Sequence, residues 1–287
     1  MRFSGAARVA GVIGWPIGHS LSPRLHNFWL RQYDLNGAYV PLAVRPFDLS
    51  TVLNGLGLAG FAGVNVTAPH KGAAFALADL WDAAAESAKA ANLLLFREGR
   101  IEARNSDVGG LAASVREEIG FDAIVGGFVT ILGAGGAARA AVLACYELGA
   151  GEILILNRTA KHASALVESL ANSVSCKLHC GVLQEWSEFA PATRLLVNAT
   201  SAGAGGTPSP VTALEGLMQD AAVCDLVYHP VETPLLALAR RLGLRTVDGL
   251  SMLMHQAAPA FESFYGVRPQ ISSALRTYLL QSPNDAQ

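Results

Sequence analysis

The sequence lacks several features that would mark specialised classes of protein. It has no run of about 18 apolar residues, so no membrane-spanning helix is expected. Residues 1–15 contain no apolar core long enough for a signal peptide. The 21 basic and 23 acidic residues nearly balance, so neither a basic surface for nucleic acid nor an acidic tail is predicted. These absences favour a soluble, cytoplasmic protein without nucleic-acid or membrane partners.

Cysteine is scarce and is not arranged as in a metal site. The four cysteines are Cys145, Cys176, Cys180 and Cys224. His179 lies between two of them, but the spacing is not that of a zinc site and no second ligand pair follows. We therefore predict no metal and expect unpaired thiols in a reducing compartment.

Apolar residues make up 51% of the 287 residues, which is ample for buried cores and, at about 150 residues per domain, suggests two domains. In the first part of the chain, short β-rich runs alternate with helical patterns. This alternation predicts an α/β domain with a mostly parallel sheet over residues 1–110. Its expected strands are residues 7–14, 37–44, 61–67 and 91–96, with a hairpin turn at 98–100.

A second α/β pattern begins at "FVTILGAGGAARAAVLACYELGA", which is typical of a strand, a glycine turn and a long helix. Further strands are expected over residues 152–159, 194–201, 222–228 and 244–249. The pattern predicts a doubly wound, Rossmann-like domain over residues 111–249. The remaining segment, residues 250–287, is expected to begin as a helix, and from its own residues it fits either domain.

The glycine turn carries the spacing of a dinucleotide-binding motif. Gly133, Gly135 and Ala138 form G-x-G-x-x-A, between a predicted strand and a predicted helix. Small residues there let a pyrophosphate approach backbone N–H groups at the start of the helix. A tight turn with no ligand is the alternative, but the strand–turn–helix context favours dinucleotide binding.

The next strand indicates which dinucleotide binds. NAD sites usually end this strand with an acid that binds the ribose 2′-hydroxyl, whereas this chain has Asn157 followed by Arg158, with Lys161 and His162 nearby. An acid would repel a 2′-phosphate, whereas an arginine pairs with it. The sequence favours NADP over NAD, with a solvated loop arginine as the alternative reading of Arg158.

A lysine stands where a predicted strand gives way to a helix. "GVNVTAPHKG" places Asn65 and Thr67 at the end of a strand and Lys71 just after Pro69. Ser20 and Ser22 lie at the start of another predicted helix, where two hydroxyls suit a carboxylate ligand. Ser22 as a mere helix cap is the alternative.

Two further segments supply polar groups at predicted strand ends. "AANLL" contains Asn92, and "ARNSDVGG" contains Asn105, Ser106 and Asp107. By itself, Asp107 reads equally well as the N-cap of the next helix.

Taken together, these segments resemble the shikimate dehydrogenase family over nearly the whole chain. The blocks appear in the family's order: "GWPIGHSLSPRLHN", "GVNVTAPHK", "NSD..G", "GAGGAARA", "NRT", "NATSAG", "DLVYHPVETPLL" and "DGLSMLMHQAAPAF". Several blocks in the right order are far more specific than the glycine motif alone.

The resemblance implies a role for each matched position. Lys71 and Asp107 match the family's catalytic pair, and Ser20 and Ser22 match the hydroxyls that hold the substrate carboxylate. The other implied substrate-binding residues are Asn65, Thr67, Asn92, Ser106, Tyr228 and Gln256. The implied cofactor-binding residues are Gly133, Ala134, Gly135, Gly136, Ala137, Asn157, Arg158, Thr159, Lys161, Thr200 and Gly249.

The resemblance also implies a fold and a reaction. Residues 1–110, completed by C-terminal helices in 250–287, would form a substrate domain that faces the NADP-binding domain across a cleft. NADPH would reduce 3-dehydroshikimate to shikimate, while Lys71 and Asp107 handle the proton. Which of the two moves it is left open, and so is the choice between monomer and homodimer.

Four positions depart from the family pattern. Lys89 stands for a usual glycine, Leu93 for a threonine beside Asn92, Ser106 for a threonine, and Ala68 for a larger aliphatic residue. A slightly larger pocket would admit quinate, which has one more hydroxyl than shikimate. The alternatives are therefore a quinate/shikimate dehydrogenase, a paralogue acting on a related ring acid, and a dinucleotide-binding protein without catalytic activity.

Overall fold

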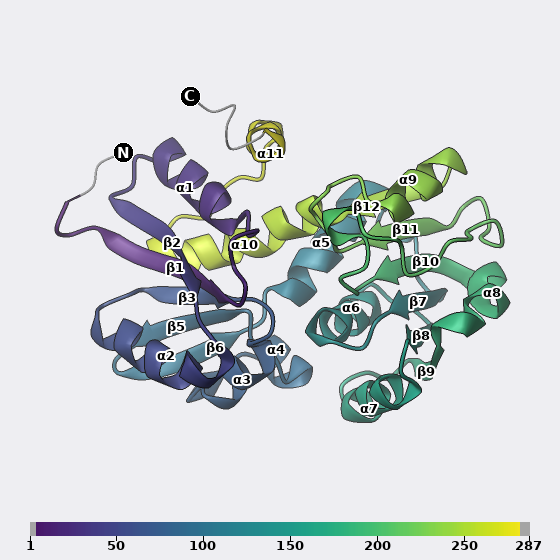
Figure 1. Ribbon diagram of the computed structural model, residues 1–287, viewed down its shortest axis with the longest axis horizontal. Coiled ribbons are helices and arrows are strands. Elements are labelled where there is room, and N and C mark those ends of the chain that lie inside the picture. Colours follow the sequence, from purple (N-terminus) through teal and green to yellow (C-terminus); the bar gives the residue numbers. More distant parts are fainter. Residues whose placement is uncertain (1–3, 282–287) are drawn as a thin grey trace. The chain divides into compact units, whose positions relative to one another are not determined.

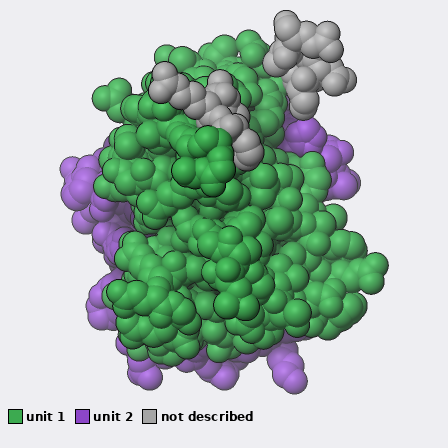
Figure 2. Space-filling model, turned by 90° about the vertical axis from the view of Figure 1, so that its left-hand side faces the viewer, with its two compact units in different colours: residues 1–106, 254–287 green, residues 107–253 purple. Residues whose placement is uncertain are grey.

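The computed structural model describes residues 4–281, and the chain forms two compact units. One contains residues 1–106 and 254–287, and the other contains residues 107–253 (Figure 1, Figure 2). The second boundary falls within helix α10 (Gly249–Tyr265).

The first unit is a six-stranded sheet with helices on both faces. Its strands are β1 (Arg8–Gly14), β2 (Gly37–Ala43), β3 (Gly63–Val66), β4 (Leu80–Trp81), β5 (Leu93–Arg97) and β6 (Arg100–Arg104). Its helices are α1 (Ser22–Gln32), the 3₁₀ helix η1 (Pro46–Asp48), α2 (Leu49–Leu58), α3 (Lys71–Ala76), α4 (Ala83–Ala88), the end of α10 and α11 (Ser273–Leu280).

The strand order in this sheet is β2-β1-β3-β5-β6-β4. The β1/β2, β1/β3 and β4/β6 pairs are parallel, whereas β3/β5 and β5/β6 are antiparallel. The predicted α/β character and the predicted hairpin after residue 97 are therefore confirmed. The two-residue strand β4, at one edge of the sheet, was not predicted.

The two faces of this sheet pack against different helices (Figure 1). On one face, α2 and α3 contribute Leu49, Leu53 and Ala74 to an aliphatic cluster that also contains Leu94 from β5. On the other face, α1 and α10 contribute aromatic side chains that pack with Tyr39 of β2. Apolar burial on both faces is the main source of stability for such a layered unit.

The aromatic layer contains a fully buried histidine. The His26 ring stacks on Tyr39 with the ring centres 3.9 Å apart and the planes 2° apart. Trp29, Phe261 and Phe264 surround the pair, and neither nitrogen of the His26 ring has a hydrogen-bond partner among the described residues. Burial lowers the pKa of His26 from 6.5 to about 3, so this ring stays neutral in the folded protein.

The second unit is built around a fully parallel sheet. Its strands are β7 (Phe128–Leu132), β8 (Glu152–Asn157), β9 (Lys177–Val182), β10 (Thr193–Asn198), β11 (Ala222–Asp225) and β12 (Arg245–Asp248). Its helices are α5 (Asp107–Ile119), α6 (Gly136–Glu147), α7 (Ala160–Leu170), α8 (Trp186–Phe189), α9 (Pro234–Arg241), the start of α10, and the 3₁₀ helices η2 (Leu183–Glu185), η3 (Ala190–Ala192) and η4 (Ala204–Gly206).

The order β12-β11-β10-β7-β8-β9 is that of a doubly wound Rossmann sheet. The strand order reverses between β7 and β10, which pair directly, and ligands of such sheets bind at this point beyond the carboxyl ends of the strands. The predicted Rossmann-like fold is confirmed.

Strand β9 is the one strand of this sheet that the sequence did not predict. It is an edge strand whose side chains are exposed or half-buried, so it lacks the apolar pattern that revealed the other strands. Cys180 lies on this strand and is exposed, and all four cysteines are free thiols. Among residues 4–281, no helix combines the length and the apolar character needed to cross a membrane.

We predict that His26 makes the protein less stable in mild acid. Because its folded pKa of about 3 lies below the unfolded value of 6.5, unfolding takes up a proton once the pH falls below about 6.5. The stability due to the neutral ring is complete above that pH and is lost progressively down to about pH 3. Between pH 7 and pH 5 the loss from this one group is about 2 kcal/mol.

Urea unfolding at pH 7 and pH 5 measures this loss. His26→Phe keeps an aromatic ring but cannot titrate, so its unfolding free energy is expected to fall by about 2 kcal/mol less than that of the wild type. Equal losses in both proteins would contradict this explanation.

Candidate active site

In the first unit, the carboxyl ends of β1 and β3 come very close together. A Cβ atom added to Gly14, the last residue of β1, would lie 2.5 Å from Cγ2 of Thr67, just after β3. The Thr67 N–H also donates to the carbonyl of Ile13, at 2.9 Å. A glycine at position 14 therefore lets the Thr67 side chain pack directly against the end of β1.

The break after β3 is anchored by His70. Its side chain is 1% exposed, and its Nε2 lies 2.8 Å from the carbonyl oxygen of Val44. Its neighbour Lys71 is the first residue of α3 and is half-buried. His70 thus fixes the backbone that carries the predicted catalytic lysine, a role that the sequence did not reveal.

Asn92, Ser106 and Gln256 form one hydrogen-bonded group. Asn92 Nδ2 donates to Ser106 Oγ at 3.0 Å and to Gln256 Oε1 at 3.3 Å, and the Ser106 N–H donates to Asn92 Oδ1 at 2.8 Å. Asn92 is 3% exposed and Gln256 is 8% exposed. Residues far apart in the sequence therefore meet here, as their predicted common role requires.

Asn65 joins the same group from β3. Its Nδ2 donates to the Asn92 carbonyl oxygen at 3.1 Å, and its Oδ1 accepts from the Tyr39 hydroxyl at 2.7 Å. Directly across the antiparallel β3/β5 pair, Asn65 faces Leu93, which is 1% exposed. The departure at Leu93 therefore lies beside a predicted substrate residue.

The segment before Ser106 is held by a helix cap. Asp82 is the N-cap of α4, and its Oδ1 accepts from the N–H groups of Ala85 at 2.7 Å and Asn105 at 3.3 Å. Asn105 Nδ2 in turn donates to the Ala90 carbonyl at 2.9 Å. Partial burial is the main influence on the pKa of Asp82, which is raised above its ordinary value despite these two bonds. Asp82 thereby couples the start of α4 to the Ser106 segment.

The departure at Lys89 has a backbone explanation. Lys89 is the C-cap of α4 and adopts the left-handed conformation, with φ 47° and ψ 35°. Glycine adopts this conformation without strain and is the usual residue at such helix ends. Lys89 is exposed, with its Nζ 5.4 Å from the centre of the Phe75 ring. This substitution therefore changes a helix end rather than the Asn92 group.

The two predicted carboxylate-binding serines lie just before and at the start of α1. Ser22 is the first residue of α1, and Leu21, not Ser22, is the N-cap, so the alternative interpretation of Ser22 as the helix cap is wrong. The Ser22 N–H donates to Ser20 Oγ at 3.3 Å. Because Ser22 has no capping bond of its own, its hydroxyl is not committed to that role.

In the second unit, the glycine turn has the geometry that the motif requires. Gly133 has φ 108°, and a Cβ there would come within 3.0 Å of Thr200 Cγ2 and 3.1 Å of the Ala199 carbonyl oxygen. Gly135 is the N-cap of α6, and a Cβ built on it meets no atom within 4 Å. The space beside Gly135, at the start of this 12-residue helix, is therefore open, as the approach of an anionic group to a helix N-terminus requires.

The positively charged residues predicted to select the cofactor lie at the end of β8. Asn157 is the last residue of this strand, and its Nδ2 donates to the Thr159 carbonyl at 3.0 Å. Arg158, Thr159 and Lys161 are exposed, the last on the first turn of α7. In a parallel sheet, neighbouring strands end on the same side, so these side chains lie on the same side of the sheet as the glycine turn.

A buried carboxylate ties together the loops that follow β10 and β11. Asp225, which is fully buried, accepts from Asn198 Nδ2 at 2.8 Å and from Thr233 Oγ1 at 2.6 Å. Asn198 Oδ1 accepts from the Thr200 hydroxyl at 2.7 Å. Burial raises the pKa of Asp225, and these hydrogen bonds oppose that rise. Asp225 thus positions Thr200, a predicted cofactor residue, by a network that the sequence did not reveal.

The remaining predicted residues have clear places in the fold. Gly249 opens α10, where a Cβ would meet the carbonyl oxygens of Leu226 at 2.5 Å and Val227 at 2.7 Å. Tyr228 is half-buried in the loop after β11. Asp107 is the first residue of α5 and is 5% exposed. Lys71 and Asp107 belong to different units, so their pairing stays a prediction.

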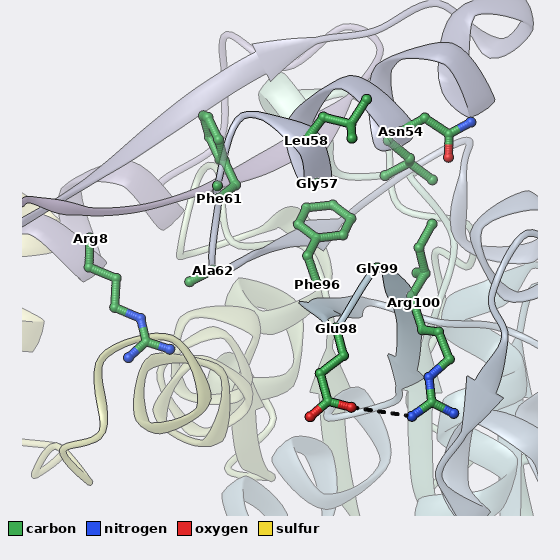
Figure 3. Close-up of a pocket in the computed structure, with 13 residues that line it drawn as sticks. Arg8, Asn54, Gly57, Leu58, Phe61, Ala62, Phe96, Glu98, Gly99 and Arg100 are labelled. Carbon is green, nitrogen blue, oxygen red and sulfur yellow. Dashed lines mark ion pairs between the residues drawn. The ribbon is translucent and has the colours of Figure 1, made fainter.

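A separate hollow of about 540 Å³ lies in the first unit (Figure 3). It is lined from the amino end of β1, the end of α2 and the turn between β5 and β6, with Phe61 and Phe96 among its walls. An ion pair of 3.7 Å joins Glu98 and Arg100 at its side. None of the predicted substrate-binding residues of the first unit line it, because those on the sheet lie at the opposite ends of its strands. Among residues 4–281, no three His, Cys, Asp or Glu side chains are grouped as metal ligands.

The fold and these side chains define a two-unit dehydrogenase with a dinucleotide-binding Rossmann sheet. A family model described as the shikimate dehydrogenase substrate binding domain matches residues 12–94, and one described as shikimate / quinate 5-dehydrogenase matches residues 118–204. The shikimate dehydrogenase (NADP(+)) of Rhodospirillum rubrum is 46% identical over 98% of this chain and 99% of its own. The chain belongs to the shikimate dehydrogenase family.

Solved structures give the same relationship. The shikimate 5-dehydrogenase of Thermus thermophilus, in complex with NADP(H) and shikimate, is 35% identical with a TM-score of 0.83, covering 95% of this chain and 98% of that one. The quinate dehydrogenase of Corynebacterium glutamicum, in complex with NAD, is 28% identical with a TM-score of 0.87, covering 96% and 99%. The family therefore contains members named for either substrate.

We predict that Thr233→Val destabilises the protein by leaving an oxygen of Asp225 without its hydroxyl donor. The change keeps the shape of the side chain but removes the hydrogen bond to the buried acid and the N-cap of α9, where Thr233 Oγ1 accepts from the Leu236 N–H at 3.2 Å. The combined cost is about 2 kcal/mol or more in unfolding free energy. Urea unfolding measures this cost. The matched control is Thr246→Val on β12, where the hydroxyl has no hydrogen bond among the described residues, and it is expected to change stability by less than about 0.5 kcal/mol. Equal losses in the two variants would contradict the role given to Asp225.

Proposed function

We propose that this protein catalyses the reversible NADP-linked interconversion of shikimate and 3-dehydroshikimate, with reduction by NADPH serving aromatic amino-acid biosynthesis. The observation that carries the proposal is the 46% identity, over 98% of the chain, to a protein named shikimate dehydrogenase (NADP(+)). The site geometry supports it, because the predicted substrate amides of the first unit form one connected group. We further propose a cytoplasmic enzyme that is a monomer or a homodimer.

The substrate site that we propose uses the strand ends of the first unit. Ser20 and Ser22, at the start of α1, would bind the substrate carboxylate through their hydroxyl groups and the helix N-terminus. The ring hydroxyls would bind to the polar side chains of this edge, which are Asn65, Thr67, Asn92, Ser106 and Gln256. Tyr228, from the second unit, would line the substrate and nicotinamide region. Because Asn92 is fixed by its own bonds, such a site is organised before substrate arrives.

The cofactor site that we propose follows the carboxyl edge of the Rossmann sheet. The open start of α6 would hold the pyrophosphate through N–H groups of Ala134, Gly135, Gly136 and Ala137. Arg158, Thr159 and Lys161 would bind the 2′-phosphate, which the neutral Asn157 does not repel. Thr200 and Gly249 would complete the site. When bound, the cofactor supplies or accepts the hydride at its nicotinamide.

The protein's own part in the reaction is proton transfer. Oxidation of the substrate hydroxyl releases a proton from that oxygen, and reduction of the ketone returns one. Lys71 and Asp107 would accept and return this proton as a pair, with the carboxylate fixing the charge and position of the ammonium. His70 holds the backbone next to Lys71, so the main-chain position from which the lysine side chain extends is fixed.

One observation favours a second candidate, a dehydrogenase that also accepts quinate. Leu93 lies directly across from Asn65, and Ser106, hydrogen-bonded to Asn92, is one methyl smaller than the family's threonine. Both changes alter the neighbourhood of the ring hydroxyls. The C. glutamicum relative, whose name specifies quinate, has the same fold. A dinucleotide-binding protein without catalysis is the alternative from another class.

We predict that Lys71→Ala abolishes turnover but keeps cofactor binding. Loss of a general acid or base costs about 10²- to 10⁴-fold in kcat. Shikimate oxidation with NADP, followed by the absorbance of NADPH, measures turnover, and a fluorescence titration with NADPH measures binding. Lys89→Gly also removes a lysine of the first unit, at a helix end that suits glycine, and is expected to keep full activity. Full activity of Lys71→Ala would contradict the proposal, and a wild type that binds NADPH without turnover would support the non-catalytic alternative.

We predict that Arg158→Gln weakens the binding of NADP without weakening the binding of NAD. Loss of a charge-assisted bond to a phosphate is expected to raise KM for NADP by about ten-fold or more, because each 1.4 kcal/mol is a factor of ten. Steady-state kinetics with both cofactors measures the change. Arg194→Gln removes another exposed arginine of the same unit, on β10, and should leave both KM values unchanged. An equal rise for NADP and NAD in Arg158→Gln would contradict 2′-phosphate recognition.

A further inference from the structure

The orientation of the Asn65 amide is determined by its partners. The Asn92 carbonyl oxygen can only accept a hydrogen bond, so the Asn65 Nδ2, 3.1 Å away, must face it. The Asn65 Oδ1 then faces the Tyr39 hydroxyl at 2.7 Å, and the phenol must donate. One hydrogen on Nδ2 has no partner among the described residues, and it is available to an oxygen atom of a ligand. If the amide flipped, its oxygen would face the carbonyl oxygen of Asn92.

Tyr39 is itself held by two neighbouring residues of α1. His26 stacks on its ring, with the ring centres 3.9 Å apart. The Asn27 side chain binds both polar groups of the Tyr39 backbone. Its Nδ2 donates to the Tyr39 carbonyl at 2.8 Å, and its Oδ1 accepts from the Tyr39 N–H at 3.2 Å. The Tyr39 side chain is 2% exposed. These contacts, which do not involve Asn65, therefore fix the position of the Tyr39 phenol.

The register of the sheet explains how the phenol reaches Asn65 from β2. Tyr39 pairs with Ala10 of β1, and Ala10 pairs with Gly63 of β3, two residues before Asn65. Paired residues lie on the same face of a sheet, so only a methyl group and a hydrogen stand between the ring and β3. A Cβ on Gly63 would lie 2.8 Å from Phe264 Cε1 of the same aromatic layer. Small residues at positions 10 and 63 thus leave the face clear for the Tyr39 side chain.

We propose that Tyr39, held by His26 and Asn27, is a positioning residue that fixes the Asn65 amide as a hydrogen-bond donor toward a substrate hydroxyl oxygen. The inference rests on the proposed function, in which Asn65 binds the substrate ring. Tyr39 itself touches neither substrate nor cofactor and acts through Asn65. A binding contact of this kind is the same in the ground state and the transition state, so its loss raises KM and leaves kcat nearly unchanged.

Tyr39→Phe tests this role, because it removes the hydroxyl and keeps the ring that stacks on His26. We expect KM for shikimate to rise by about five- to thirty-fold, with kcat within about two-fold and KM for NADP unchanged. The matched control is Tyr265→Phe. The Tyr265 hydroxyl donates at 2.8 Å to the carbonyl of Ala38, the residue next to Tyr39, so this variant also loses one phenol hydrogen bond to β2. It is expected to lose thermal stability without a change in KM.

A second measurement separates this inference from the proposed function. The side-chain amide of Asn65, identified in an ¹⁵N NMR spectrum as the pair of signals absent from Asn65→Asp, is expected to exchange with solvent faster in Tyr39→Phe than in the wild type or Tyr265→Phe. A wild type that does not oxidise shikimate would contradict the proposed function. The positioning role would be overturned by unchanged KM and unchanged exchange in Tyr39→Phe, or by an equal rise of KM in Tyr265→Phe.

Discussion

Every buried polar group at a strand end needs a hydrogen-bond partner, and both units depend on this requirement. An unsatisfied amide or carboxylate in an apolar interior costs about 1–3 kcal/mol or more. In the first unit, the buried amide of Asn92 is satisfied by Ser106 and Gln256, which come from other parts of the chain. In the second unit, the buried acid Asp225 is satisfied by Asn198 and by the loop before α9. The same bonds that stabilise the fold therefore also fix the strand-end loops.

Fixed loops give this fold a way to bind ligands with little reorganisation. At the carboxyl edge of the Rossmann sheet, the turn at Gly133 and the open start of α6 leave room for an anion, while Arg158 supplies exposed positive charge. At the carboxyl ends of β1 and β3, Asn65 already has its amide oriented by Tyr39. Preorganised donors of this kind bind a polar substrate more tightly than mobile ones, because the conformational entropy of their side chains is already lost on folding and is not lost again on binding.

Local patterns in the sequence revealed most of the fold, because buried strands have apolar runs and the glycine motif stands between a strand and a helix. They did not reveal β9, whose side chains are exposed or half-buried. They indicated Asn92 and Ser106 as polar groups at predicted strand ends, but the roles of these two residues and of Gln256 were predicted only by family resemblance. The link from Tyr39 to Asn65 depends on the register of β2, β1 and β3, which no local pattern specifies. The fully buried Asp225 gave no signal beyond its place within a predicted strand.

The most direct test of the proposed function is a comparison of kcat/KM for shikimate and quinate, each with NADP and with NAD, followed by the absorbance of the reduced nicotinamide. Our account predicts the highest value for shikimate with NADP, because Asn157 replaces the acid of NAD sites, Arg158 follows it, and the predicted shikimate-binding amides form one connected group. The highest value for quinate with NAD, or no turnover of any of the four pairs, would contradict it.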